Sequence, residues 1–357
     1  MKDQKSHLEI DKIKGGYVWL YLEIYGQVNH KSKRSVIKML NIIIPSYKAR
    51  ETLPQALDSL VAQTKKLFII TIVQDADGED YKDIIEEYTR RGLKIRLLAT
   101  PVNGGPGNAR QYGMDNDLMC DYFAFMDADD MFTPRAVEIL YGEAKRHDAD
   151  IVLTDFYAER AHEPGIYLSC NSTPITWCHG KIYKAKYLRE NHIRFLPELR
   201  LNEDSYFNLV AVNATSKKFY INELTYLWRD NKNSLTRAEG TTNFFLKSWE
   251  QYILSQVQAL IDISKLRGTV NSDVLAATLI NIYDHCMKAI YLNCNSDLKI
   301  LSLLGQLTVV KNGINTTQFW EYVQEHLKAC IMFDDCLIFY KQRFCDWLNV
   351  LIAEDNK

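Results

Sequence analysis

An apolar run at positions 40–45, closed by Pro45, is the sequence feature that most constrains the fold of this chain. Such a run is typical of a strand buried on both faces of a parallel sheet. Further apolar runs follow at 67–73, 94–99, 122–126 and 151–154. Segments between them carry apolar side chains at helical spacing, as Leu53, Leu57 and Leu60 do. Strands that alternate with helices predict an α/β domain with a mostly parallel sheet flanked by helices.

The length of 357 residues favours more than one domain, because single cores rarely grow beyond about 250–300 residues. Residues 1–38, in which lysine and arginine outnumber the acids, are predicted to form an N-terminal extension. Residues 39–240 contain the alternating pattern and form the predicted α/β domain. From residue 241 the apolar spacing turns helical, so 241–357 is predicted to be a helical domain that packs on the α/β domain. Self-association through this part stays open.

Composition and charge narrow the classes of function. With 25% charged residues and a formal net charge of -2, no overall field attracts the protein to nucleic acid or to an anionic membrane. The eight cysteines include no CxxC pair of the kind that binds structural zinc, and no secretory signal precedes them. No apolar run reaches the roughly 18–20 residues that span a bilayer. We therefore expect a cytoplasmic protein with reduced thiols, and peripheral contact with a membrane stays open.

A cluster of acids follows the run at 122–126. Side chains alternate along an extended strand, so Asp127 and Asp129 are expected to project the same way. Two carboxylates this close repel each other unless a cation or a hydrogen-bond donor lies between them. A hard divalent ion with oxygen ligands would relieve the repulsion, and such ions also bind diphosphates. The alternative is a solvated acidic turn in which Asp130 or Thr133 caps the next helix.

A further acid, Asp75, ends the run at 67–73. Its carboxylate can accept a hydrogen bond from an N–H donor such as the imide of uracil. The alternative is turn chemistry, because Asp77 is followed by glycine and Asp-Gly is a strong turn pair. In open α/β sheets, ligands bind beyond the carboxyl ends of the strands, which is where both acidic segments lie.

The glycine-rich segment 103–107 lies between these acids in the sequence. Glycines permit close approach of the backbone, and a helix N-terminus after such a loop favours phosphate. Arg110, one turn into the expected helix, can offer a planar fork to a base or a phosphate. The segment lacks the GxxxxGK[ST] signature of a P-loop and does not follow the first strand as a dinucleotide fingerprint would.

The order of these motifs resembles that of family 2 glycosyltransferases, which are nucleotide-sugar enzymes with a mixed GT-A sheet. The matching segments are Pro45-Ser46-Tyr47, Val73-Gln74-Asp75-Ala76-Asp77, 103–113, Phe125-Met126-Asp127-Ala128-Asp129-Asp130, His179-Gly180-Lys181-Ile182-Tyr183, Glu203-Asp204, and Tyr226-Leu227-Trp228-Arg229 with Ser234-Leu235-Thr236. Together they cover roughly residues 40–237. Gln74 stands where the family has an acid, Asp77 where it has a serine, and Gln111 where it has an asparagine.

The resemblance implies a donor site for a nucleotide-diphosphate sugar, with uridine as the base. Asp127 would hold the ribose, and Asp129 would bind Mn²⁺ or Mg²⁺ as in the family's DXD motif. His179 would be a further ligand of the metal or the diphosphate, although a surface loop histidine is the alternative. The residues that the resemblance assigns to the donor are Pro45, Ser46, Tyr47, Asp75, Arg110, Asp127 and Arg229. Arg237 is a weaker candidate for the diphosphate.

The acid pair Glu203-Asp204 carries the implied chemistry. Asp204 would act as the general base that takes the proton from the acceptor hydroxyl, and a single displacement would invert the anomeric configuration. Glu203 would orient Asp204 or bind the acceptor. Outside the family pattern, two acids at a helix start are explained by the helix dipole alone.

Two other classes of function remain as alternatives. One is a protein that binds sugar nucleotides without turnover. The other is a nucleotidyltransferase, which would need a glycine-rich signature on the first strand that residues 46–49 lack. The acceptor classes that fit are a glycan, a polymer, a lipid-linked oligosaccharide or a protein. A nucleic-acid acceptor is less favoured because of the charge balance.

Overall fold

The computed structural model describes residues 37–117, 120–160, 163–170, 176–231, 242–291, 308–330 and 342–349. The predicted N-terminal extension lies outside these ranges except for its last two residues. The predicted boundary between residues 240 and 241 also lies outside them, as do Ser234-Leu235-Thr236 and Arg237. Both domain limits therefore stay predictions.

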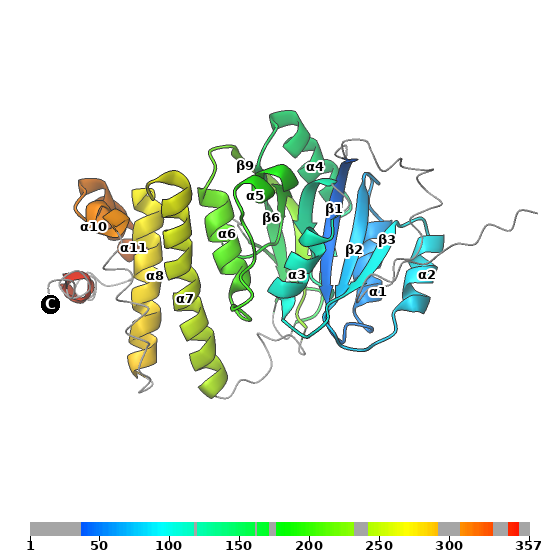
Figure 1. Cartoon of the computed structure of the whole chain (residues 1–357), viewed down its shortest axis with the longest axis horizontal. Helices are drawn as coiled ribbons and strands as arrows, with labels where there is room; N and C mark the ends of the chain where they lie inside the picture. The colour runs from blue at the N-terminus through cyan, green and yellow to red at the C-terminus, as the bar shows by residue number, and fades with distance from the viewer. Residues whose placement is uncertain are drawn as a thin grey trace, which may run out of the picture.

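A nine-stranded sheet forms the centre of the described structure, in the order β3-β2-β1-β4-β8-β6-β9-β5, with β7 paired to β6 (Figure 1). The strands are β1 (Ile37–Ser46), β2 (Phe68–Gln74), β3 (Ile95–Ala99), β4 (Cys120–Phe125), β5 (Met131–Phe132), β6 (Ile151–Glu159), β7 (Tyr167–Cys170), β8 (Lys181–Lys184) and β9 (Lys218–Trp228). The helices are α1 (Leu53–Val61), α2 (Lys82–Arg90), α3 (Pro106–Asp115), α4 (Ala136–His147), α5 (Ala185–Glu190), α6 (Glu203–Asn213), α7 (Thr242–Arg267), α8 (Ser272–Tyr291), α10 (Thr308–Ile314) and α11 (Thr317–Cys330).

The expected mixed sheet flanked by helices is confirmed. Strands β3, β2, β1 and β4 run parallel to one another, as the alternation of strands and helices predicts. The second half of the sheet is less parallel than expected, because β8 runs antiparallel to both β4 and β6. Strand β9 returns parallel to β6, and the short β5 pairs antiparallel with β9.

Strand β1 has side chains in two hydrophobic cores, which explains its apolar run. Leu40, Ile42 and Ile44 pack in one core with α1, α2 and α4, whereas Ile43 packs in the other. Alternating side chains of one strand thus serve both faces of the sheet. All four side chains are fully buried.

The core around Ile43 continues into the C-terminal helices. It includes Phe207 of α6, Leu260 of α7, Leu279 of α8 and Phe319 of α11. Figure 1 shows α7 and α8 side by side, with α6 between them and the sheet. Among the residues that the structure describes, no helix is long and apolar enough to cross a membrane.

Candidate active site

The carboxyl ends of β1, β2 and β4 meet at one edge of the sheet, because these strands are parallel neighbours. Ser46, Asp75 and the acids after β4 therefore lie at the same edge of the sheet. The backbone N–H of Asp75 donates to the carbonyl of Ser46 at 2.8 Å. Tyr47, the next residue, has 51% of its surface exposed, so its side chain remains accessible at this edge.

The Asp75 carboxylate holds the glycine-rich loop. It accepts hydrogen bonds from the N–H groups of Gly104 (3.0 Å) and Gly105 (2.7 Å) and from the hydroxyl of Thr100 (2.9 Å). The Asp75 residue is 3% exposed. Backbone donors that were expected to face a phosphate thus bind a carboxylate of the chain itself, and the contact between Asp75 and a nucleobase stays a prediction.

Two glycines allow α3 to begin where it does. Gly105 precedes Pro106 with φ of 86°, in the left-handed region that glycine adopts without strain. A side chain at Gly107 would place its Cβ 2.4 Å from Cγ of Glu203. The absence of that side chain lets the start of α6 approach α3.

Arg110 on α3 links two acids from distant parts of the sequence. Its Nη1 lies 2.7 Å from Oε1 of Glu203, and its Nη2 lies 2.5 Å from Oδ1 of Asp127. Burial opposes the charge of Arg110, but Asp127 and Glu203 nearby raise its pKa well above the ordinary value. The guanidinium is buried and engaged with these acids. The contact of Arg110 with the donor stays a prediction.

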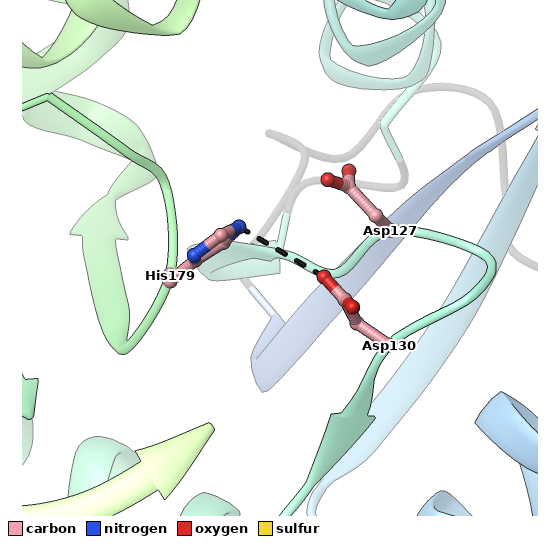
Figure 2. Close-up of side chains that lie close together, drawn as sticks. All are labelled: Asp127, Asp130 and His179. Atoms are coloured by element: carbon pink, nitrogen blue, oxygen red, sulfur yellow. Dashed lines mark ion pairs between the residues drawn. The ribbon is translucent and has the colours of Figure 1, made fainter. Parts of the chain in front are cut away.

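Asp127, Asp130 and His179 form a cluster whose ligand atoms all lie within 4.8 Å of one another (Figure 2). His179 lies two residues before the start of β8, and its Nε2 is 3.8 Å from Oδ2 of Asp130. The imidazole stacks on the ring of Tyr226 with 4.5 Å between ring centroids. Figure 2 shows the carboxylate of Asp130 pointing at the imidazole.

The electrostatics of this cluster favour a bound cation. Burial, and then the charges of Asp129 and Asp127, raise the pKa of Asp130 well above its ordinary value. Burial lowers the pKa of His179 to about 3, so the ring is neutral near pH 7. Its Nδ1 is buried and has no hydrogen-bond partner among the described residues. Two carboxylates and a neutral imidazole suit a divalent ion, so the residues present fit the metal that the motifs imply.

Asp129, the predicted metal ligand, is not part of this cluster. Residues 127–130 form a turn in which the N–H of Asp130 donates to the carbonyl of Asp127 at 3.1 Å. The alternation expected of an extended strand therefore does not hold here, and Asp130 comes to lie beside Asp127. Asp129 accepts a hydrogen bond from Nδ2 of Asn231 at 2.8 Å. Its role as a ligand stays a prediction.

Asp204 lies in the first turn of α6 and is half-buried. Burial, and then the neighbouring Glu203, raise the pKa of Asp204 to about 7. Glu203 itself is 6% exposed and paired with Arg110, and burial raises its pKa as well. Asp204 is thus the more accessible acid of the pair, and a contact between Glu203 and an acceptor stays a prediction.

Arg229 is tied to the cluster through its backbone. Its N–H donates to Oδ1 of Asp130 at 2.8 Å, and the hydroxyl of Tyr226 donates to Oδ2 of the same residue at 2.7 Å. The guanidinium of Arg229 contacts Gln55, and its Nε lies 4.0 Å from Glu159. Its predicted contact with a diphosphate stays a prediction.

Three residues of this region have no site role that the sequence predicts. Asp130 and Tyr226 stand inside recognised motifs, but their roles depend on neighbours in space. Lys181 also lies in a motif. It is 2% exposed and donates to the carbonyl of Trp177 at 2.7 Å, and burial lowers its pKa to about 8. A single sequence contains no pattern that predicts the burial of a lysine side chain to this degree.

The relatives found by comparison with known proteins include glycosyltransferases. Residues 41–206 match the family described as Glycosyl transferase family 2. The uncharacterized glycosyltransferase EpsJ of Bacillus subtilis is 27% identical over 247 residues, covering 63% of this chain and 70% of EpsJ. The poly(ribitol-phosphate) beta-glucosyltransferase of Bacillus spizizenii is 28% identical over 226 residues, covering 58% of this chain and 35% of that protein.

A solved structure has the same fold. The crystal structure of Staphylococcus aureus TarS 1-349 in complex with UDP-GlcNAc aligns with a TM-score of 0.59 at 17% identity, covering 89% of this chain and 91% of that one. Residues 41–206 place this part of the chain in glycosyl transferase family 2, and the fold is of the GT-A type. It is a glycosyltransferase, as the motifs indicate.

Proposed function

We propose that the chain transfers a sugar from a uridine-diphosphate donor to an acceptor hydroxyl, with inversion at the anomeric carbon and with Asp204 as the general base. The observation that carries this proposal is the position of Asp204, a half-buried carboxylate in the first turn of α6, where burial and the neighbouring Glu203 raise its pKa to about 7. A base with this pKa is about half ionised at pH 7 and accepts a proton readily.

The proposed reaction is one displacement. The acceptor oxygen forms a bond with the anomeric carbon while the bond from that carbon to the diphosphate breaks. The hydroxyl proton passes to the carboxylate of Asp204. Arg110 and Glu203 do not touch the reacting atoms in this proposal. Their buried ion pair holds α3 against α6 and so fixes Asp204 relative to Asp127.

Asp127, Asp130 and His179 would hold Mn²⁺ or Mg²⁺, with Asp129 as a further candidate ligand. Such an ion neutralises charge that develops on a leaving diphosphate. The neutral imidazole of His179, whose Nε2 faces Asp130, and the mutual repulsion of Asp127 and Asp130 support this assignment.

A uridine nucleotide is proposed because the related fold of TarS was solved with UDP-GlcNAc. The exposed ring of Tyr47 and the edge formed by Pro45 and Ser46 would receive the base, next to Asp75. Arg229 would approach the diphosphate. Polymeric acceptors are proposed because relatives are named as poly(ribitol-phosphate) transferases. A cytoplasmic location accords with a nucleotide-sugar donor.

The test is a screen of nucleotide sugars for Mn²⁺-dependent hydrolysis, with wild-type protein and Asp204→Asn in parallel. Release of UDP from one donor by the wild type supports the proposal. Binding of a donor without turnover would favour a non-catalytic binding protein. Formation of a nucleoside triphosphate and a sugar phosphate when pyrophosphate is added to a nucleotide sugar would favour a nucleotidyltransferase. No response to any donor would overturn the transferase.

A further inference from the structure

Helix α7 reaches the start of α6 through the side chain of Gln251. The Oε1 of Gln251 accepts hydrogen bonds from the backbone N–H groups of Arg200 (2.9 Å) and Leu201 (2.7 Å). These residues come directly before the turn that carries Asp204. One side-chain oxygen therefore holds two consecutive peptide groups ahead of the proposed base.

The next residue, Asn202, is bound by the same helix. Its Nδ2 donates to the carbonyl of Ser248 at 2.9 Å. Asn202 has φ of 60°, a left-handed conformation that asparagine tolerates better than most residues. It occupies the N-cap position of α6, yet its side chain makes no capping hydrogen bond. The backbone at the start of α6 is thus held from α7 instead of by its own cap.

The opposite side of this segment contacts the glycine-rich loop. The Nη2 of Arg200 donates to the carbonyl of Asn103 at 2.6 Å. A Cβ on Gly105 would lie 3.8 Å from the carbonyl oxygen of Arg200, and Gly105 is itself bound by Asp75. Residues 200–202 therefore lie between α7 and the loop that begins α3.

We propose that Gln251 is a positioning residue for sugar transfer, which holds the chain ahead of α6 and so orients Asp204 toward the acceptor. This inference rests on the function proposed above. Gln251 acts through Arg200 and Leu201 and touches no reacting atom. A displacement of about 1 Å at a reacting group can lower turnover by about 100-fold. The effect of losing Gln251 should therefore fall on kcat and not on the KM for the donor.

Three variants test the proposal by steady-state kinetics. Gln251→Leu removes the acceptor oxygen and should lower kcat by about 10-fold or more, with the donor KM changed by less than about twofold. Gln251→Glu keeps an acceptor oxygen and should retain at least about half of kcat. The matched control is Gln258→Leu, a half-buried glutamine on the same helix that donates to Asp262, and it should leave kcat unchanged.

Hydrogen exchange of the Arg200 and Leu201 amides gives a readout that does not depend on activity. Exchange should be faster in Gln251→Leu and unchanged in Gln251→Glu and Gln258→Leu. Wild-type kcat in Gln251→Leu, equal losses in both Gln251 variants, or unaltered exchange would each overturn the inference. If the wild type turns over no nucleotide sugar, the proposed function fails, while the exchange data still decide whether Gln251 holds the segment.

Discussion

The side chain of Gln74 donates a hydrogen bond to Oδ1 of Asp77, and these are two of the positions where the chain departs from the motifs of its family. Asp77 also accepts from the N–H groups of Lys48 (2.7 Å) and Glu79 (3.0 Å). Burial opposes its charge, but these donors hold the pKa of Asp77 below its ordinary value. The amide at position 74 thus compensates for the additional carboxylate at position 77.

The first prediction is that this pair behaves as a unit. Gln74→Asp alone places two carboxylates side by side, and Asp77→Ser alone removes the acceptor of several donors, so each should destabilise the fold. The double variant carries the family residues. Its loss in free energy of unfolding, measured by urea denaturation, should be smaller than the sum of the two single losses by about 0.5–3 kcal/mol. Gln74→Asp combined with Asp273→Ser, on the exposed side of α8, should be additive. Additivity in both pairs would refute the compensation.

The second prediction concerns the general base. Asp204→Asn should lower kcat by about 100- to 10,000-fold, because an amide cannot take the proton of the acceptor. Binding of UDP, measured by calorimetry, should change by less than about threefold. Asp273→Asn is the matched control and should keep full turnover. Transfer at the wild-type rate by Asp204→Asn would exclude this residue as the base.

The third prediction is an acid limb in the pH profile. With the Asp204 pKa at about 7, kcat/KM should fall about tenfold per pH unit below that value and level off above it. The stability of the fold should change with pH in the opposite direction. A carboxyl whose pKa is raised in the folded state makes the protein less stable as pH rises from 3.8 towards 7. Asp204→Asn should therefore gain more in Tm at pH 8 than at pH 5. An equal gain at both values would contradict the raised pKa.

The fourth prediction addresses the buried ion pair. Arg110→Met leaves Glu203 and Asp127 without their counter-charge and should destabilise the fold by about 3–5 kcal/mol. Adding Glu203→Gln removes one of the uncompensated charges and should recover part of that loss. The measurement is the free energy of unfolding of the two single variants and the double variant. A double variant that is less stable than Arg110→Met would contradict the claim that Arg110 compensates the buried charge of Glu203.

The fifth prediction is that the Asp127, Asp130 and His179 cluster binds Mn²⁺. In the presence of UDP, Asp130→Asn and His179→Ala should each weaken Mn²⁺ binding by at least about tenfold, measured from the electron paramagnetic resonance signal of free Mn²⁺. His147→Ala, on the exposed end of α4, should bind Mn²⁺ as the wild type does. Wild-type affinity in both cluster variants would place the ion elsewhere.

Much of the fold could be read from local patterns. The run that contains Ile42 and Ile43 predicted a strand buried on both faces, and β1 has Ile42 in one core and Ile43 in the other. The motif around Asp127 also predicted an acidic edge at the end of β4. The predicted directions of the acidic side chains were wrong. Side chains alternate along an extended backbone, whereas residues 127–130 form a turn.

The linear order of residues determined which segments are strands, which acids end them and which family the chain joins, since these follow from periodicity and motif spacing. Only the tertiary structure decided that Asp130 faces His179, that Arg110 spans Asp127 and Glu203, and that α7 holds the start of α6. Such contacts join residues far apart in the sequence, and they depend on close packing of elements whose relative positions no local pattern specifies.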